Sequence, residues 1–431
     1  MKYYSTNKQA PLVDFREATI AGLAPDKGLY FPHYIPQLSD SFLSEIEHLA
    51  DADIGYAVMQ PYVGNTIPDD KLREIIRQTL SFEIPLVSVT EKIASLELFH
   101  GPTFAFKDLG ARFMSRCMGY FAEQIDKPMT VLVATSGDTG GAVANGFYNV
   151  PGVEVVILYP SGKVSEVQEL QLTTLGGNIR ALEVEGTFDD CQRMVKDAFA
   201  DATLRESLFL TSANSINVAR WLPQQLFYFL GYKQWKPQAT RPVVAVPSGN
   251  FGNICSGMLA KESGLPLGDF VVACNANDAV VDYLQSGSYC AKPTVATISN
   301  AMDVGNPSNF VRILELYGNN YHAINRQIKG YTISDEDTLA TIRSVYHDTG
   351  YLLDPHGAVA YQALSRYLSV NPEESGFILE TAHPIKFELP NDIRFQCSDQ
   401  LREALQQLRA ATKQSVRISP QYQALKAYLL H

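Results

Sequence analysis

One lysine, Lys107, lies in a setting that predicts a lowered pKa and a reactive amine. It follows the Gly-Pro-Thr turn at residues 101–103 and has Phe104 and Phe106 close by. Apolar surroundings remove water from the ammonium form, so the pKa falls and a nucleophilic amine becomes accessible near neutral pH. A Schiff base with an aldehyde cofactor requires such an amine. The alternative is an ordinary lysine whose stem packs on the phenylalanines while its ammonium reaches water.

A glycine-rich turn at residues 248–253 could hold an anion. The apolar run 242–247 leads into Ser-Gly-Asn-Phe-Gly-Asn, and a helical pattern starts directly after it. Backbone N–H groups at closely spaced glycines can approach an anion at the positive end of a helix. A single phosphate fits, because the turn matches neither G-x-x-x-x-G-K-[ST] nor G-x-G-x-x-G. The alternative is a tight turn capped by asparagine side chains.

A second turn of the same form follows the apolar run 130–134 and adds hydroxyl groups. It reads Thr-Ser-Gly-Asp-Thr-Gly at residues 135–140. Hydroxyls and backbone amides at the start of a helix suit a substrate carboxylate. The alternative is that Asp138 and Thr139 simply cap the helix.

Short apolar runs that alternate with helical patterns would position these groups. Parallel strands buried on both faces have this near-continuous apolar character, so we expect an α/β fold of open, mostly parallel sheets with helices on both faces. Ligands bind at the carboxyl ends of such strands. One lysine and two anion-binding turns at that edge are what a pyridoxal phosphate enzyme needs. The runs are 130–134, 153–159, 180–184, 242–247 and 269–273.

Composition excludes several other classes of protein. The 431 residues exceed one core and suggest two or three domains. A net charge of -11 argues against nucleic-acid binding, and no apolar run is long enough for a membrane helix. The six cysteines form no Cys-x-x-Cys pair, which favours free thiols in the cytoplasm. No His-x-x-x-His pair is present, so we expect no metal.

The motifs, taken in order, resemble the threonine synthase family, pyridoxal phosphate enzymes with the tryptophan synthase β-like fold (fold type II). The resemblance covers most of the chain outside the C-terminal tail, where residues 398–431 are expected to form two polar helices. Asp354-Pro-His356 also matches the family, but a turn and helix N-cap are the expected role there. The other matching segments are 28–32, 98–108, 134–140, 212–217, 247–253, 299–304, 307–310 and 381–387.

The resemblance implies a role for each candidate site residue. Lys107 would form the Schiff base with the cofactor and move protons. Asp138 is a departure, since many relatives with this fold have Asn there, bonded to the cofactor's phenolic oxygen. Thr381 would place its hydroxyl against the pyridine nitrogen. The cofactor phosphate would be held by Gly249, Asn250, Phe251, Gly252 and Asn253. The substrate would be bound by Ser136, Gly137, Asp138 and Thr139. The cations for the substrate's phosphate would be Lys163 and Arg112, with Arg220 a weaker candidate.

The reaction that the resemblance implies converts O-phospho-L-homoserine and water to L-threonine and phosphate, by γ-elimination and β-addition of water. The implied domains are an N-terminal domain (1–95), a large cofactor-binding domain (96–130 and 216–431) and a small mobile domain (131–215). The enzyme would be a monomer or a homodimer. Alternatives are a phospho-lyase or a threonine/serine dehydratase that releases a 2-keto acid. A silent binding protein would have lost the lysine or the phosphate turn, and both are present.

Overall fold

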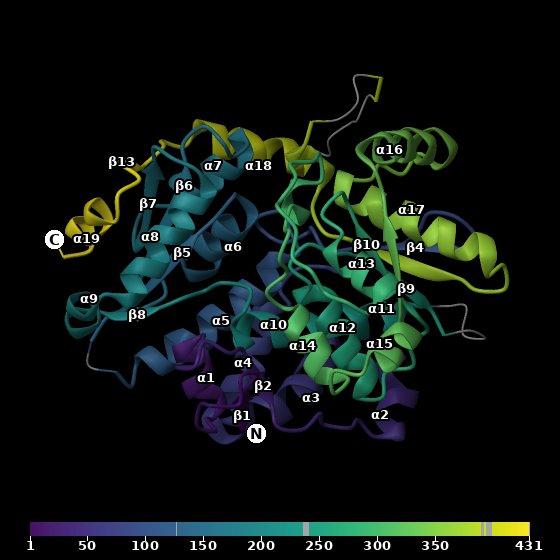
Figure 1. The fold of residues 1–431 in the computed structure, drawn as a ribbon, viewed down its shortest axis with the longest axis horizontal. Helices are drawn as coiled ribbons and strands as arrows, with labels where there is room; N and C mark the ends of the chain where they lie inside the picture. The colour runs from purple at the N-terminus through teal and green to yellow at the C-terminus, as the bar shows by residue number, and fades with distance from the viewer. Residues whose placement is uncertain (126, 236–240, 389–391, 394–398, 431) are drawn as a thin grey trace.

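Two largely parallel sheets, each covered by helices on both faces, form the body of the molecule (Figure 1). The computed structural model describes residues 1–431 except 126, 236–240, 389–391, 394–398 and 431. The predicted α/β class with mostly parallel sheets is confirmed, and each of the five apolar runs forms a strand. No helix in the described ranges is long and apolar enough to span a bilayer.

The six-stranded sheet has the order β11-β10-β9-β12-β4-β3 and is parallel except for β3. Alternate residues of β9 enter different cores. Val244 and Val246 pack with α5 (Lys107–Ala122), α11 (Gln225–Gln234) and α12 (Gly252–Glu262), whereas Val243 and Ala245 pack with α16 (Asp335–Thr349) and α17 (Pro355–Val370). Both faces are therefore buried, which explains the continuous apolar runs. The strands are β3 (Leu86–Ser88), β4 (Ile93–Glu97), β9 (Val243–Pro247), β10 (Phe270–Cys274), β11 (Ile328–Thr332) and β12 (Gly376–Glu380).

The five-stranded sheet has the order β13-β7-β6-β5-β8, all parallel, and lies on the left in Figure 1. Its edge strand β13 comes from the C-terminal tail, which was expected to be helical only. The tail contains α18 (Asp399–Ala410) and α19 (Tyr422–Leu430) with β13 between them, so it joins the sheet of the predicted small domain. The strands are β5 (Met129–Ala134), β6 (Val153–Pro160), β7 (Ile179–Val184), β8 (Phe209–Thr211) and β13 (Val416–Ile418).

The N-terminal region packs beneath both sheets and shares their central core. Its strands β1 (Tyr3–Ser5) and β2 (Tyr30–Pro32) form a small antiparallel pair. The large sheet already begins within this region, at β3. The region also contains α1 (Phe15–Ala21), α2 (Asp40–Glu45), α3 (Asp51–Val63) and α4 (Asp69–Thr79), with the 3₁₀ turns η1 (Ile46–His48) and η2 (Gly64–Thr66).

Helices follow many of the parallel strands, so the turns that lead from a strand into a helix lie at the carboxyl edges of the sheets. Those that matter for the site are α5 (Lys107–Ala122) after β4, α6 (Asp138–Phe147) after β5 and α12 (Gly252–Glu262) after β9. The others are α7 (Glu166–Thr173), α8 (Phe188–Ala200), α9 (Ala202–Ser207), α10 (Val218–Trp221), α11 (Gln225–Gln234), α13 (Ala279–Ser286), α14 (Phe310–Leu316), α15 (Tyr321–Gln327), α16 (Asp335–Thr349) and α17 (Pro355–Val370), with the 3₁₀ turns η3 (Leu222–Gln224), η4 (Asn300–Met302) and η5 (Pro384–Lys386).

Candidate active site

Lys107 is the first residue of α5 and lies beside the segment that contains Thr381. The Phe106 N–H donates to the Thr381 carbonyl (2.8 Å), and the His383 N–H donates to the Phe104 carbonyl (3.0 Å). A β-bridge joins the residues between them. The two segments, far apart in the sequence, are therefore fixed side by side, and none of the described residues bonds the Thr381 hydroxyl.

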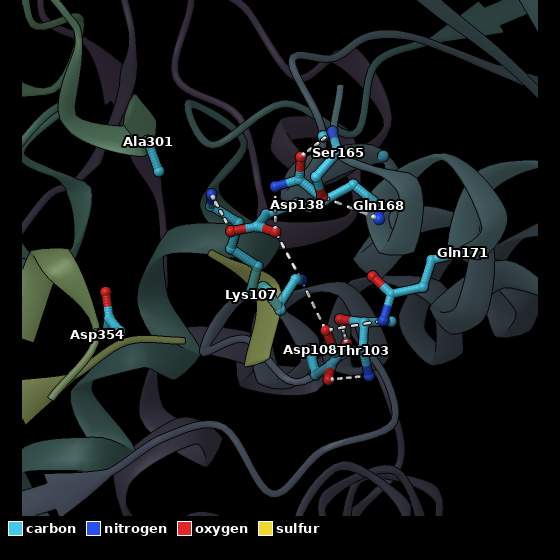
Figure 2. A network of polar contacts seen from close by, with 12 residues as sticks. Thr103, Lys107, Asp108, Asp138, Ser165, Gln168, Gln171, Ala301 and Asp354 are labelled. Carbon is cyan, nitrogen blue, oxygen red and sulfur yellow. Dashed lines mark hydrogen bonds and ion pairs between the residues drawn. The ribbon is translucent and has the colours of Figure 1, made fainter. Parts of the chain in front are cut away.

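A buried carboxylate, Asp138, lies between two lysines. Its Oδ2 is 3.8 Å from Lys107 Nζ, and its Oδ1 is 2.6 Å from Lys386 Nζ. Gln168 Nε2 also donates to Oδ1, at 2.9 Å. Figure 2 shows Lys107, Asp138 and Gln168 converging, with dashed lines for these contacts. The sequence reasoning missed Lys386, although it is the only lysine in the matching segment 381–387.

Burial and the charges of this cluster lower the pKa of both Lys107 and Asp138. Burial lowers the pKa of Lys107, and the positive charges of Lys386 and Arg220 add to this effect while Asp138 opposes it. Burial alone would raise the pKa of Asp138, but Lys386 and Lys107 outweigh it and bring that pKa below its ordinary value. The pKa of Lys107 therefore moves in the direction that the sequence predicts, beside an ionised Asp138.

The turn before Lys107 is held by a second carboxylate, Asp108. Its Oδ2 accepts from the Thr103 N–H (2.8 Å) and its Oδ1 from the Thr103 hydroxyl (2.6 Å). Burial raises the pKa of Asp108 to about 6, although both bonds from Thr103 lower it. The Thr103 carbonyl accepts from Lys386 Nζ (2.8 Å) and Gln171 Nε2 (3.1 Å). The turn thus links α5, α7 and η5.

The turn after β9 presents hydrogen-bond donors that have no described partner. Phe251 adopts a left-handed conformation (φ 61°), and no side chain caps the start of α12. The Asn253 amide nitrogen is buried without a partner among the described residues, while its Oδ1 accepts from the Tyr228 hydroxyl at 2.9 Å. An uncapped helix start with a free buried donor fits a phosphate group. The Asn250 side chain is already engaged, donating to Ser215 Oγ (2.7 Å) and accepting from the Ser308 N–H (2.6 Å).

The turn after β5 is fixed from within. Thr135 Oγ1 accepts from the N–H groups of Gly137 (3.0 Å) and Gly140 (2.8 Å), so Thr135 does the bonding that had been considered for Asp138 and Thr139. No side-chain bond comes from the N-cap residue itself. Gly137 has φ 140°, a conformation that requires glycine, and Gln168 leaves no room for a side chain there. Ser136 is exposed and Thr139 half-buried, so both hydroxyl residues are accessible.

The three candidate cations lie in different places. Arg112 donates to the Gln78 carbonyl (3.0 Å) and Ser81 Oγ (2.9 Å), in the N-terminal region. Lys163 is exposed between β6 and α7. Arg220 is buried, bonds the Ala213 carbonyl at 2.6 Å and leaves its Nε without a described partner. Burial lowers the pKa of Arg220 to about 10, so it stays charged. Of the three, Arg220 contributes to the lowered pKa of Lys107.

The Asp354-Pro-His356 motif forms the predicted N-cap, at the start of α17. Asp354 Oδ1 accepts from the N–H of His356 (2.7 Å) and from its Nδ1 (2.5 Å). His356 Nε2 in turn accepts from the Ala301 N–H at 3.1 Å. Ala301 and Asp354 lie to one side of Lys107 in Figure 2. The histidine therefore supports the turn at η4, which packs against Gly249.

Comparison with known proteins identifies the family of the chain. A model described as "Threonine synthase N terminus" matches residues 2–80, and one described as "Pyridoxal-phosphate dependent enzyme" matches residues 82–377. The chain belongs to the threonine synthase family. Threonine synthase of Escherichia coli (strain K12) is 45% identical over 393 residues, 90% of each chain. That of Haemophilus influenzae is 42% identical over 431 residues, the full length of both.

Solved structures agree with this family in fold and cofactor. Pyridoxal phosphate-bound threonine synthase from Brucella melitensis superposes with a TM-score of 0.92 at 33% identity, covering 100% of this chain and 98% of that one. The Escherichia coli enzyme gives 0.89 at 40% identity, covering 100% and 99%. A threonine deaminase from Solanum lycopersicum, 16% identical with a TM-score of 0.55, shares the fold alone. The predicted fold type and the predicted cofactor, pyridoxal phosphate, are confirmed.

Proposed function

We propose that this threonine synthase family member converts O-phospho-L-homoserine and water into L-threonine and phosphate, with Lys107 as the lysine that carries pyridoxal phosphate. One observation supports it above all. A half-buried lysine with a lowered pKa follows β4 and lies beside a segment whose Thr381 hydroxyl has no partner among the described residues. The uncapped start of α12 follows the parallel strand β9, at the same edge of the sheet. The net reaction breaks the bond between the γ-carbon and oxygen, and places hydrogen on the γ-carbon and hydroxyl on the β-carbon.

The residues present fit the cofactor. The backbone of Gly249–Asn253 and the Asn253 amide nitrogen, which has no partner among the described residues, would bind its phosphate. The Thr381 hydroxyl would face its ring nitrogen. When bound, pyridoxal phosphate withdraws electrons from the α-carbon of an amino acid and makes the attached proton acidic. Lys107 Nζ is then the base that takes and returns protons, because its free amine is favoured by its surroundings.

The substrate's two anionic ends would bind at different turns. The start of α6, with Ser136, Gly137 and Thr139, offers N–H and hydroxyl groups to the α-carboxylate. We assign the phosphate of the substrate to Arg220, a buried cation whose Nε has no partner among the described residues. An Arg220→Lys variant should raise KM for O-phospho-L-homoserine about tenfold or more, since the planar fork is lost. Arg112→Lys, the matched control, should change it less than about twofold.

The proposal includes a movement of the predicted small domain. Residues 131–215 would form a mobile domain that closes over the substrate and excludes water until phosphate has left. Solution scattering with and without a substrate analogue tests this, and unchanged profiles would contradict it.

We place the enzyme in the cytoplasm, as a monomer or homodimer without nucleic-acid partners. The five described cysteines are free, which supports a reducing compartment.

The decisive experiment identifies the carbon product by NMR after incubation with O-phospho-L-homoserine. Threonine and phosphate in equal amounts would establish the synthase. The keto acid 2-oxobutyrate with ammonia and phosphate would instead indicate the alternative phospho-lyase on the same scaffold. Lys107→Ala should abolish product formation, whereas Lys196→Ala, on the exposed face of α8, should leave it unchanged.

A further inference from the structure

Lys386 and Lys107 compete unequally for the single carboxylate of Asp138. Lys386 Nζ is 2.6 Å from Oδ1, whereas Lys107 Nζ is 3.8 Å from Oδ2. Lys386 also donates to the Thr103 carbonyl at 2.8 Å, and its side chain has no exposed surface. An ammonium at the Lys386 position therefore has two close acceptors. An ammonium at the Lys107 position has only the more distant Asp138 Oδ2 among these acceptors.

The charge balance of the buried cluster follows from this geometry. An ionised Asp138 neutralises one ammonium. A second ammonium, at Lys107, would be an uncompensated charge on a side chain with only 18% of its surface exposed, which is costly. Since Lys386 has the better partners, the neutral arrangement is charged Lys386, ionised Asp138 and uncharged Lys107.

The other ionisable groups around Lys107 do not supply a second counterion within the described residues. Asp108, on the same helix, uses both carboxylate oxygens for Thr103. Arg220, from α10, adds positive charge. His383, from the segment after β12, is kept neutral because burial, followed by the charge of His100, lowers its pKa to about 4.

We propose that Lys386 is a positioning residue for the reaction: by taking Asp138 as its ion-pair partner, it prevents this carboxylate from becoming the permanent counterion of Lys107. Lys107 is thereby left as an uncharged amine that can accept a proton, and Asp138 Oδ2 remains near enough to stabilise the ammonium that results. The inference rests on the proposed role of Lys107.

The test measures how reactive the Lys107 amine of the apoenzyme is at each pH. Apoenzyme is mixed with pyridoxal phosphate, the adduct is fixed with borohydride, and peptide mass analysis quantifies label on Lys107. In Lys386→Met, Asp138 has only Lys107 to pair with, so the pH at which labelling reaches half its maximum should rise by about one to three units. Lys386→Arg should retain the original profile. The matched control is Lys413→Met, which removes a partner of the buried Glu183 (2.9 Å) and should leave the profile unchanged.

The double variant Lys386→Met/Asp138→Asn separates charge from packing. With both charges removed, the half-labelling pH should return to the wild-type value or fall below it. An unchanged profile in Lys386→Met would overturn the proposal, as would a raised profile that persists in the double variant. If Lys386→Met fails to fold by circular dichroism, Lys386→Gln takes its place: it also removes the ammonium, and its half-labelling pH should rise in the same way, whereas an unchanged value would overturn the proposal. Absence of label on Lys107 in the wild type would instead contradict the proposed function.

Discussion

Two turns of the same strand–glycine–helix form provide opposite kinds of site. The turn after β9 contains uncharged side chains, leaves the start of α12 uncapped and has a buried amide nitrogen without a described partner. The turn after β5 contains Asp138, held between two lysines and Gln168. Its N–H groups are partly used by Thr135. The first turn is open to an anion, whereas the second already contains one.

The difference shows how one local fold can serve two purposes. An open set of neutral donors accepts a phosphate group at little cost in reorganisation, because the helix start supplies partial positive charge. A carboxylate in the equivalent place is itself an anion, and here its charge is balanced by Lys386. Surrounded by cations, it instead adjusts the protonation of the lysine beside it. Side-chain charge at one or two positions decides between these outcomes, and exchanging that charge is the strongest way to test the comparison.

Introducing a carboxylate into the phosphate turn should have the largest effect. Asn253→Asp would place a negative charge where the free amide donor lies. Like charges in contact cost several kcal/mol, so pyridoxal phosphate should bind at least about a hundredfold more weakly. Absorbance titration of the apoenzyme measures this. Asn253→Ala removes the donor without adding charge and should lose clearly less; equal losses in the two variants would mean that charge is not the deciding property.

Asp108, the carboxylate that follows Lys107 in the sequence, predicts that the stability of the protein depends on pH. Burial raises the pKa of Asp108 to about 6, from 3.8, so the native state binds the proton more tightly than the unfolded state. Its stabilising contribution is therefore complete below about pH 4 and is lost as the pH rises through 6. Asp108→Asn should be more stable than wild type above pH 6, by up to about 3 kcal/mol, since each pKa unit is worth about 1.4 kcal/mol.

Urea unfolding of both proteins at several pH values tests the Asp108 prediction. The gain in stability should shrink below pH 6 and vanish near pH 4. A difference between the two proteins that does not change with pH would show that Asp108 is not the group responsible.

The two turns were visible in the sequence, but the feature that distinguishes them was not. Apolar runs predicted strands such as β5 and β9, because continuous burial leaves a local pattern. The Asp354 cap was likewise predicted from neighbouring residues. Lys386 was missed because its contact with Thr103 spans 283 residues, and no local pattern records such a pair. Arg112 was favoured for lying near Lys107 in sequence, yet its side chain bonds the N-terminal region instead.

Close approach of backbone segments supports the open turn, and a single methyl group tests it. A Cβ at Gly249 would lie 2.6 Å from Met302 Cα, so the turn would have to shift. Gly249→Ala should cost about 1–3 kcal/mol of stability and weaken pyridoxal phosphate binding about tenfold. Gly141→Ala, within α6 and outside the phosphate turn, is the matched control, because its Cβ would come no closer than 3.3 Å to a described atom, Gln171 Oε1. Thermal unfolding and absorbance titration give the comparison; similar effects at both positions would count against a specific contact with η4.

The smallest effect concerns the orientation of the Asn253 amide, which makes the open turn a donor. The Tyr228 hydroxyl lies 2.9 Å from Asn253 Oδ1 and so directs the amide nitrogen away from itself. In Tyr228→Phe this constraint is lost, and the amide can turn its oxygen toward the bound anion. Loss of one buried hydrogen bond is worth about 1–1.5 kcal/mol, so pyridoxal phosphate should bind about tenfold more weakly. Tyr367→Phe, which loses a bond to Glu374 (3.0 Å) elsewhere on the sheet, should bind normally. Unchanged affinity in Tyr228→Phe would mean that the backbone N–H groups alone hold the phosphate, and the contrast between the two turns would then lie in their main chains.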